Sequence, residues 1–176
     1  MRFTETPLRG AFVIELEPHA DARGFFARSF CRREFQAHGL DPDIAQRNLS
    51  FNQRAGTVRG MHFQKAPAAE AKLIRCLRGR IHDVVIDLRP SSPTFQHHCA
   101  VELTDATLNA LYVPKGLAHG FQSLVDETLV EYQMSEYHSP ESGAGFRYDD
   151  PAFNLAWPLA VTTISEQDLA WPAFAS

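Results

Sequence analysis

The chain has 176 residues and a formal net charge of -4, with 44% hydrophobic and 22% charged residues. This length predicts one domain, residues 1–176, that buries a substantial core. Because there is no broad basic field, we expect neither nucleic acid nor a membrane surface as a partner. No apolar stretch is long enough to span a bilayer, and the N-terminus lacks the apolar core of a signal peptide. The three widely spaced cysteines, without a CxxC pair, indicate a reduced, cytoplasmic protein.

Strand patterns dominate the chain and follow one another at short spacing. The expected strands are AFVIELE (11–17), GFFARSF (24–30), two strands within 72–88 that are broken at Gly79, and residues 99–104, 110–114, 119–125 and 128–137. Short helices are expected near residues 31–38 and after Ser165, where SEQD matches an N-cap followed by acidic residues. Many short strands predict an antiparallel sandwich or barrel, because closure removes exposed sheet edges.

Alternation along two of these strands predicts where side chains point. In IHDVVIDL (81–88), Asp83 and Asp87 share one face, and the other face is mostly apolar. The first face is therefore expected either to be wet or to line a polar cavity. In LVEYQMSEY (129–137), Tyr132 shares its face with apolar residues and is expected inside the barrel. It could be a packed core tyrosine or a catalytic group.

The stretch VRGMHFQ (58–64) leaves three interpretations of His62: a metal ligand, a packed core histidine or a catalytic base. Metal-binding cupins use an HxH pair, a glutamate and a distant third histidine. Here the second position of the pair is Gln64, and Lys72 follows the nearby Glu70. An amide is a poor substitute for imidazole, and an ammonium group opposes a divalent cation. We therefore expect neither a metal nor another cofactor.

Without a metal, the polar residues expected inside the barrel are His62, Lys72, His119 and Tyr132. Burying them unpaired would be costly, which favours a functional set over isolated core residues. Such a set suits proton abstraction next to a carbonyl. A neutral imidazole takes the proton, a lysine holds the enolate oxygen, and a phenol on the far side returns a proton.

Groups for binding an anionic ligand are also present in the sequence. Arg23 and Arg59 could hold phosphate oxygens through bidentate contacts. Phe26 and Phe63 could pack against a ring.

Several stretches carry a resemblance to a known family. They are DARGFFARSF (21–30), QRNLSFNQRAGTVRGMHFQ (46–64), AKLIRCLRGRIHDVVIDLRPSSPTF (71–95), LYVPKGLAHGFQSL (111–124), EYQMSEYHSP (131–140), FRYDDP (146–151), WPL (157–159) and ISEQD (164–168). In this order, over nearly the whole chain, they resemble dTDP-4-dehydrorhamnose 3,5-epimerase. The most specific motifs are RGxHxQ and P-x-G-x-A-H-G-F.

The resemblance implies a mostly β, metal-free cupin barrel (a jelly roll) with a few short helices, acting without a cofactor as a homodimer. It implies epimerisation of a nucleotide-linked 4-keto-6-deoxyhexose at C3, at C5 or at both. His62 resembles the general base, Asp168 the aspartate that orients it, Tyr132 the general acid, and Lys72 the group on the enolate oxygen. Positions that resemble nucleotide-sugar contacts are Arg23, Gln46, Asn48, Arg59 and His119. In the family, residues around Arg23 and Phe26 reach the partner's active site, so each site would be composite.

Four positions depart from the family pattern, and all belong to substrate binding. Arg28 and Gly143 stand where the family usually has glutamate, His138 where it has a tyrosine that stacks on thymine, and Gln167 where it has lysine. The expected substrate is dTDP-linked. The alternatives are the same chemistry on a CDP- or GDP-linked sugar, inversion at only one carbon, or a non-catalytic sugar-nucleotide-binding cupin. The intact acid–base set argues against the last of these.

Overall fold

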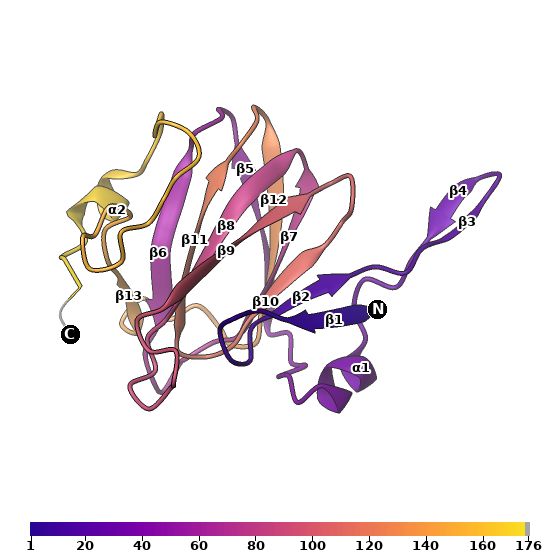
Figure 1. Cartoon of the computed structure of the whole chain (residues 1–176), viewed down its shortest axis with the longest axis horizontal. Helices are drawn as coiled ribbons and strands as arrows, with labels where there is room; N and C mark the ends of the chain where they lie inside the picture. Colours follow the sequence, from indigo (N-terminus) through magenta and orange to yellow (C-terminus); the bar gives the residue numbers. More distant parts are fainter. Residues whose placement is uncertain (175–176) are drawn as a thin grey trace.

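In a computed structural model that describes residues 1–174, two antiparallel sheets pack face to face as a barrel (Figure 1). The six-stranded sheet contains, in spatial order, β1 (Arg2–Glu5), β2 (Phe12–Glu15), β10 (Ala110–Val113), β7 (Lys72–Arg78), β12 (Thr128–Met134) and β5 (Gln46–Asn52). The five-stranded sheet contains β13 (Gly143–Gly145), β6 (Val58–Gln64), β11 (Leu117–Ser123), β8 (Arg80–Asp87) and β9 (His98–Thr104). The mostly β, antiparallel architecture predicted from the strand spacing is confirmed.

Two short helices flank the barrel, as the sequence predicted. Helix α1 (Arg32–Ala37) is followed by Gly39, whose positive φ of 70° suits the end of a helix. Helix α2 (Glu166–Ala170) begins at Ser165, whose Oγ accepts a hydrogen bond from the backbone N–H of Asp168 at 3.0 Å. Neither helix, nor any other in residues 1–174, has the length and apolar character needed to cross a membrane.

The expected strand at residues 24–30 is wrong in its extent. Only β4 (Gly24–Phe26) is extended, and it pairs with β3 (His19–Asp21) over three residue pairs. The resulting hairpin projects away from the barrel (Figure 1), so no further strand is present to extend the ladder. The predicted alternation of faces beyond Phe26 therefore does not occur.

Strand β8 is buried on both faces. Val85 belongs to the core between the two sheets, together with residues of β7, β11 and β12. Val84 and Ile86, on the other face, pack against Phe146 and Phe153 from the segment that follows the last strand. This segment, residues 146–174, thus forms an apolar layer outside the five-stranded sheet. The wet-face interpretation of Asp83 and Asp87 is wrong, because both side chains are fully buried.

A close approach of β6 and β11 brings two histidines together. Gly60 has a φ of 128°, and a Cβ there would lie only 2.6 Å from the Cα of Gly120. The two strands pair His62 with His119, and their register shifts before the next pair, which contains Arg59. A bulge of this kind redirects side chains. Arg59 and His62 therefore both line the barrel cavity, although they are three positions apart.

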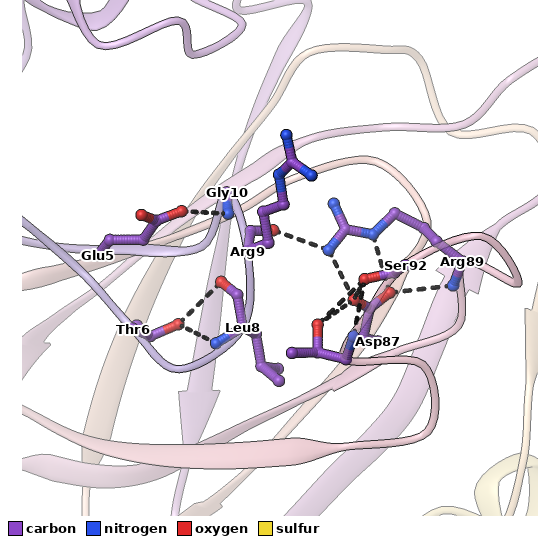
Figure 2. Close-up of polar contacts among 9 residues, drawn as sticks. Glu5, Thr6, Leu8, Arg9, Gly10, Asp87, Arg89 and Ser92 are labelled. Atoms are coloured by element: carbon purple, nitrogen blue, oxygen red, sulfur yellow. Dashed lines mark hydrogen bonds and ion pairs between the residues drawn. The ribbon is translucent and has the colours of Figure 1, made fainter.

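Asp87 ends β8 with a dense set of hydrogen bonds (Figure 2). Its Oδ1 accepts from Nε of Arg89 at 2.8 Å, and its Oδ2 accepts from the hydroxyls of Ser92 at 2.5 Å and Thr94 at 2.7 Å. Arg89 also donates to the backbone oxygen of Arg9, which joins two loops at this end of the barrel. Burial opposes the charge, but these donors outweigh it and hold the pKa of Asp87 well below its ordinary value of 3.8.

Asp87→Asn should lower the free energy of unfolding at neutral pH by roughly 2–4 kcal/mol, because buried donors lose a charged acceptor. Since the folded pKa is depressed, the contribution of Asp87 is complete above the ordinary value and is lost as the pH falls below about 4. Urea denaturation should therefore show the two proteins converging between neutral and acidic pH. The exposed Asp149→Asn, which loses a pair with Arg147, should change stability by less than about 1 kcal/mol. A difference independent of pH would contradict this role.

Candidate active site

A cavity of about 630 Å³ opens between the two sheets. Its walls come from β5, β6, β7, β11 and β12, with α2 and the residues after β12 at the rim. The predicted site residues that line it are Asn48, Arg59, His62, Lys72, His119, Tyr132, His138 and Asp168. This volume lies in the ordinary range for small-molecule sites.

His62 and Asp168 form a hydrogen-bonded pair in this cavity. Nε2 of His62 lies 2.6 Å from Oδ1 of Asp168, whose other oxygen accepts a hydrogen bond from the N–H of Gly60 at 3.3 Å. Burial alone would raise the pKa of Asp168, but the bonds from His62, Gly60 and Ser165 keep it below its ordinary value. An ionised carboxylate only accepts, so Nε2 carries the proton and Nδ1 is left free to take one.

Lys72 lies beside this pair at the start of β7. Its Nζ is 3.1 Å from Oε1 of Glu70 and 3.4 Å from the backbone oxygen of His62. Both side chains of the ion pair are largely buried and line the cavity. An ammonium group fixed in this way offers a positive charge at a defined point of the wall.

Tyr132 reaches the cavity from β12, in the sheet that faces β6. Its ring makes an edge contact with His119, at a centroid distance of 6.1 Å, and packs at a tilt against Phe121, at 6.3 Å. Burial raises the pKa of Tyr132, and the negative charge of Asp83 raises it further, against the opposing effect of Arg59. The side chain is therefore a phenol that can donate a proton.

A second histidine–carboxylate pair lies deeper in the barrel. Nε2 of His119 contacts Oδ1 of Asp83, and both side chains are buried. The pairing in β8 and β11 places the two strands side by side. Of the two interpretations of the face that carries Asp83, wet or lining a polar cavity, the second is closer to the observed structure. The carboxylate lies inside the barrel, beside a histidine that lines the cavity.

The chain as a whole is similar to known proteins. Residues 5–176 match the family model for dTDP-4-dehydrorhamnose 3,5-epimerase. The chain belongs to this family. It is 40% identical to the dTDP-4-dehydrorhamnose 3,5-epimerase of Methanothermobacter thermautotrophicus over 97% of this chain and 92% of the relative. The epimerase is thus an isomerase, as the sequence predicted.

Solved structures agree with this assignment. The Bacillus anthracis dTDP-4-dehydrorhamnose 3,5-epimerase, crystallised with TDP and pyrophosphate, superposes with a TM-score of 0.94 at 37% identity, covering 98% of this chain and 99% of that one. A 3'-monoepimerase from Streptomyces bikiniensis, in complex with dTDP-quinovose, gives 0.88 at 33% identity, covering 96% and 85%. The predicted cupin fold of the epimerase is confirmed.

Three predicted binding residues of the epimerase lie outside its own cavity. Arg23 pairs with Asp21 in the turn of the β3–β4 hairpin, and Phe26 at the end of β4 is 77% exposed. Arg28 pairs with Glu34 of α1 at 3.3 Å. One chain therefore does not bring these side chains to its own His62. Gln46 is also absent from the cavity wall, but its Oε1 accepts a hydrogen bond from the N–H of His138 at 2.6 Å.

The side chain of Gln64 forms hydrogen bonds with the loops around the cavity. Its Nε2 donates to the backbone oxygens of Ala68 and Tyr137, at 2.8 and 3.1 Å, and its Oε1 accepts from the N–H of Ser139 at 2.7 Å. The amide thus ties two loops to β6. Across residues 1–174, no three His, Cys, Asp or Glu side chains gather as a metal-binding set.

Several residues of the wall were not predicted as part of the site, and Trp171 and Glu70 are two that contact predicted members. Trp171, after α2, lies edge-on to His62 at a ring-centroid distance of 6.4 Å. Glu70 was noted only as a neighbour of Lys72. Its two-residue spacing from Lys72 could have suggested a shared face in an extended segment, whereas no local pattern singles out Trp171.

Proposed function

We propose that the protein epimerises a dTDP-linked 4-keto-6-deoxyhexose at C3 and C5, the carbons that flank the ketone. The observation that carries this proposal is the placement of His62 and Tyr132 on strands of opposite sheets that share one cavity. Inversion requires a base on one face of the sugar ring and an acid on the other. Two groups on facing walls meet that requirement.

In the proposed reaction, the free Nδ1 of His62 removes a proton from the carbon next to the ketone. The negative charge moves to the ketone oxygen, where the ammonium of Lys72 stabilises it. Such preorganised donors typically contribute about 10²–10³-fold to the rate. Tyr132 then donates a proton from the opposite face, and Asp168 stabilises the imidazolium in the meantime.

We further propose that the active site is completed by a second copy of the chain. Phe26 is largely exposed, on a hairpin that projects from the barrel (Figure 1). Leu49 and Phe51, on the edge strand β5, are 65% and 54% exposed. Apolar side chains gathered on an edge strand favour an interface between proteins. In such a homodimer, the hairpin carries Arg23 and Phe26 to the partner's cavity.

The identity of the substrate's nucleotide is the one part of the proposal for which an alternative has support. Structures of two relatives contain TDP or dTDP-quinovose, which favours a dTDP-linked sugar here. His138, Gly143 and Gln167, however, all line the cavity. These are positions where the sequence departs from the family pattern, so a CDP- or GDP-linked sugar is the second candidate.

The proposed function is tested by incubating the protein with dTDP-4-keto-6-deoxyglucose in deuterated water. We expect deuterium at C3 and C5 and formation of the rhamno-configured ketone, followed by proton NMR. Label at one carbon alone would indicate a mono-epimerase. No label at either carbon, with a correctly folded protein, would contradict the proposal.

The same preparation allows calorimetric comparison of dTDP, CDP, GDP and UDP. We expect dTDP to bind tightest, and a clear preference for CDP or GDP would support the second candidate. If Arg28 reaches a cavity in the dimer, Arg28→Glu, which restores the residue usual in the family, should change the relative affinities for the four nucleotides. The matched reversal Arg32→Glu, which breaks a surface pair with Asp43, should leave affinity unchanged.

A further inference from the structure

Lys72, the residue proposed to stabilise the enolate, forms an ion pair with Glu70 at the cavity wall. Its Nζ lies 3.1 Å from Oε1 of Glu70, and the two side chains are only 12% and 9% exposed. Nζ also donates a hydrogen bond to the backbone oxygen of His62 at 3.4 Å. An ammonium group has three N–H donors, so these two contacts leave at least one donor for a ligand in the cavity.

The backbone that carries this ion pair is fixed by the six-stranded sheet. Glu70 comes just before β7, and Lys72 is the first residue of that strand, which pairs with β10 on one side and β12 on the other. Between them, the N–H of Ala71 donates to Oγ of Ser135 at 2.8 Å, and the oxygen of Ala71 accepts from the N–H of Ser135 at 2.9 Å. The sheet therefore holds Glu70 in place, although Glu70 lies outside the strand.

The other charges in the cavity show why Lys72 needs such a support. Among the described residues that line it, the carboxylates are Glu70 and Asp168, and Asp168 is already bonded to His62. Arg59 is a second cation of the wall. The proposed substrate brings a diphosphate into this cavity. A lysine ammonium is a point charge on a flexible four-carbon stem, so without a partner it would be drawn to the phosphates and away from the ketone.

We propose that Glu70 is a positioning residue that keeps the ammonium of Lys72 at the ketone oxygen of the substrate and away from the phosphates. The inference rests on the proposed role of Lys72 in the epimerisation. Glu70 and the backbone oxygen of His62 occupy two of its donors, and the remaining donor serves the oxygen on which the enolate charge develops. Glu70 thus affects the rate of proton removal through Lys72, with no contact of its own to the sugar.

A double-mutant cycle on the rate of deuterium exchange at C3 and C5 tests this role. Glu70→Ala should lower the rate by about tenfold or more, because a donor displaced by about 1 Å stabilises the enolate much less. The nucleotide dTDP, which has no ketone, should bind at least as tightly as it does to the wild type. In a Lys72→Met background, Glu70→Ala should have no further effect on exchange, because the carboxylate acts only through Lys72.

Two variants control for charge and structure. Glu70→Gln keeps an oxygen that can accept from the ammonium, and it should lose only about threefold in exchange rate, because a neutral acceptor holds a cation less strongly. Asp41→Asn removes the partner of Lys115, an ion pair outside the cavity, and should leave the exchange rate unchanged. If Glu70→Ala does not fold, because it leaves a buried ammonium unpaired, Glu70→Gln takes its place in the cycle.

Lysine reactivity tests the restraint on Lys72 without any substrate. The chain has three lysines, Lys65, Lys72 and Lys115, and trace acetylation followed by peptide mass spectrometry distinguishes them. In Glu70→Ala, acetylation of Lys72 relative to the exposed Lys65 should rise by roughly tenfold, because the ion pair no longer holds the amine. In Asp41→Asn, the increase should fall on Lys115 instead.

An unchanged exchange rate in folded Glu70→Ala, the same loss with and without Lys72, or an unchanged reactivity of Lys72 would each overturn the proposal. A fall in dTDP affinity that parallels the loss of rate would also overturn it, since it would indicate damage to the whole cavity. Failure of both Glu70 variants to fold would make the residue purely structural, with the same consequence. Absence of exchange in the wild type would contradict the proposed function itself, and this case is recognised separately because acetylation needs no substrate.

Discussion

His62→Ala should abolish the incorporation of solvent deuterium at both C3 and C5 of the substrate. The imidazole is 42% exposed to the cavity and is oriented by Asp168, and the alanine leaves no group at that place to take the proton. Loss of a general base typically costs about 10²–10⁴-fold in rate. Nucleotide affinity should change little, because the proposed contacts to the phosphates and base come from other residues.

Deuterium exchange followed by NMR gives the rate of proton removal independently of the product formed. His98→Ala is a suitable control, because this histidine is exposed on β9 and away from the cavity. Asp168→Asn should give an intermediate loss, since the imidazole remains but its orientation and charge balance change. Exchange at the wild-type rate in His62→Ala would mean that another group, such as His119, is the base.

Tyr132→Phe should separate the two halves of the reaction. The variant keeps the ring that packs against His119 and Phe121 but lacks the acidic hydroxyl. Proton removal by His62 should continue at a reduced rate, while return of a proton to the opposite face should fall by about 10²-fold or more. Deuterium would then enter with retention of configuration more often than with inversion.

The measured quantity is the ratio of exchanged to inverted product, taken at C3 and C5 separately. Tyr112→Phe provides a matched control, because it removes another buried hydroxyl, one that accepts a hydrogen bond from the N–H of Asp41 outside the active site. That variant should leave the ratio unchanged. Equal losses of exchange and inversion in Tyr132→Phe would indicate that the tyrosine shapes the cavity and does not deliver the proton.

Local patterns were sufficient for much of the fold. The break at Gly79, the helix after Ser165 and the inward face of Tyr132 follow from turn chemistry, capping and alternation, which act over a few residues. The strand predicted over residues 24–30 was too long, because a strand ends where its partner ends and the partner is not visible in the local sequence. The bulge that places Arg59 and His62 on one wall likewise arises from pairing between β6 and β11.

Less of the site could be predicted from local sequence patterns, because the residues that pair in it are far apart in the sequence. His62 and Asp168 are separated by 106 positions, and His119 and Asp83 by 36. The first pair was expected only through the family resemblance. The second was missed, although alternation had marked Asp83 as facing away from the apolar side of its strand. Strand order decides which of these side chains meet, and no short segment encodes that order.

The segment after the last strand links activity to the integrity of the outer layer. Phe146 and Phe153 of residues 146–174 cover β8, and the same segment carries Asp168 to His62. Segments on the outside of a core are often the first to open in local unfolding. If this segment opened, the barrel strands would keep their pairing while His62, the proposed base, lost its contact with Asp168. Enzyme activity would then depend on the packing of residues 146–174 against β8. On heating, activity would be lost at a lower temperature than the one at which the barrel unfolds.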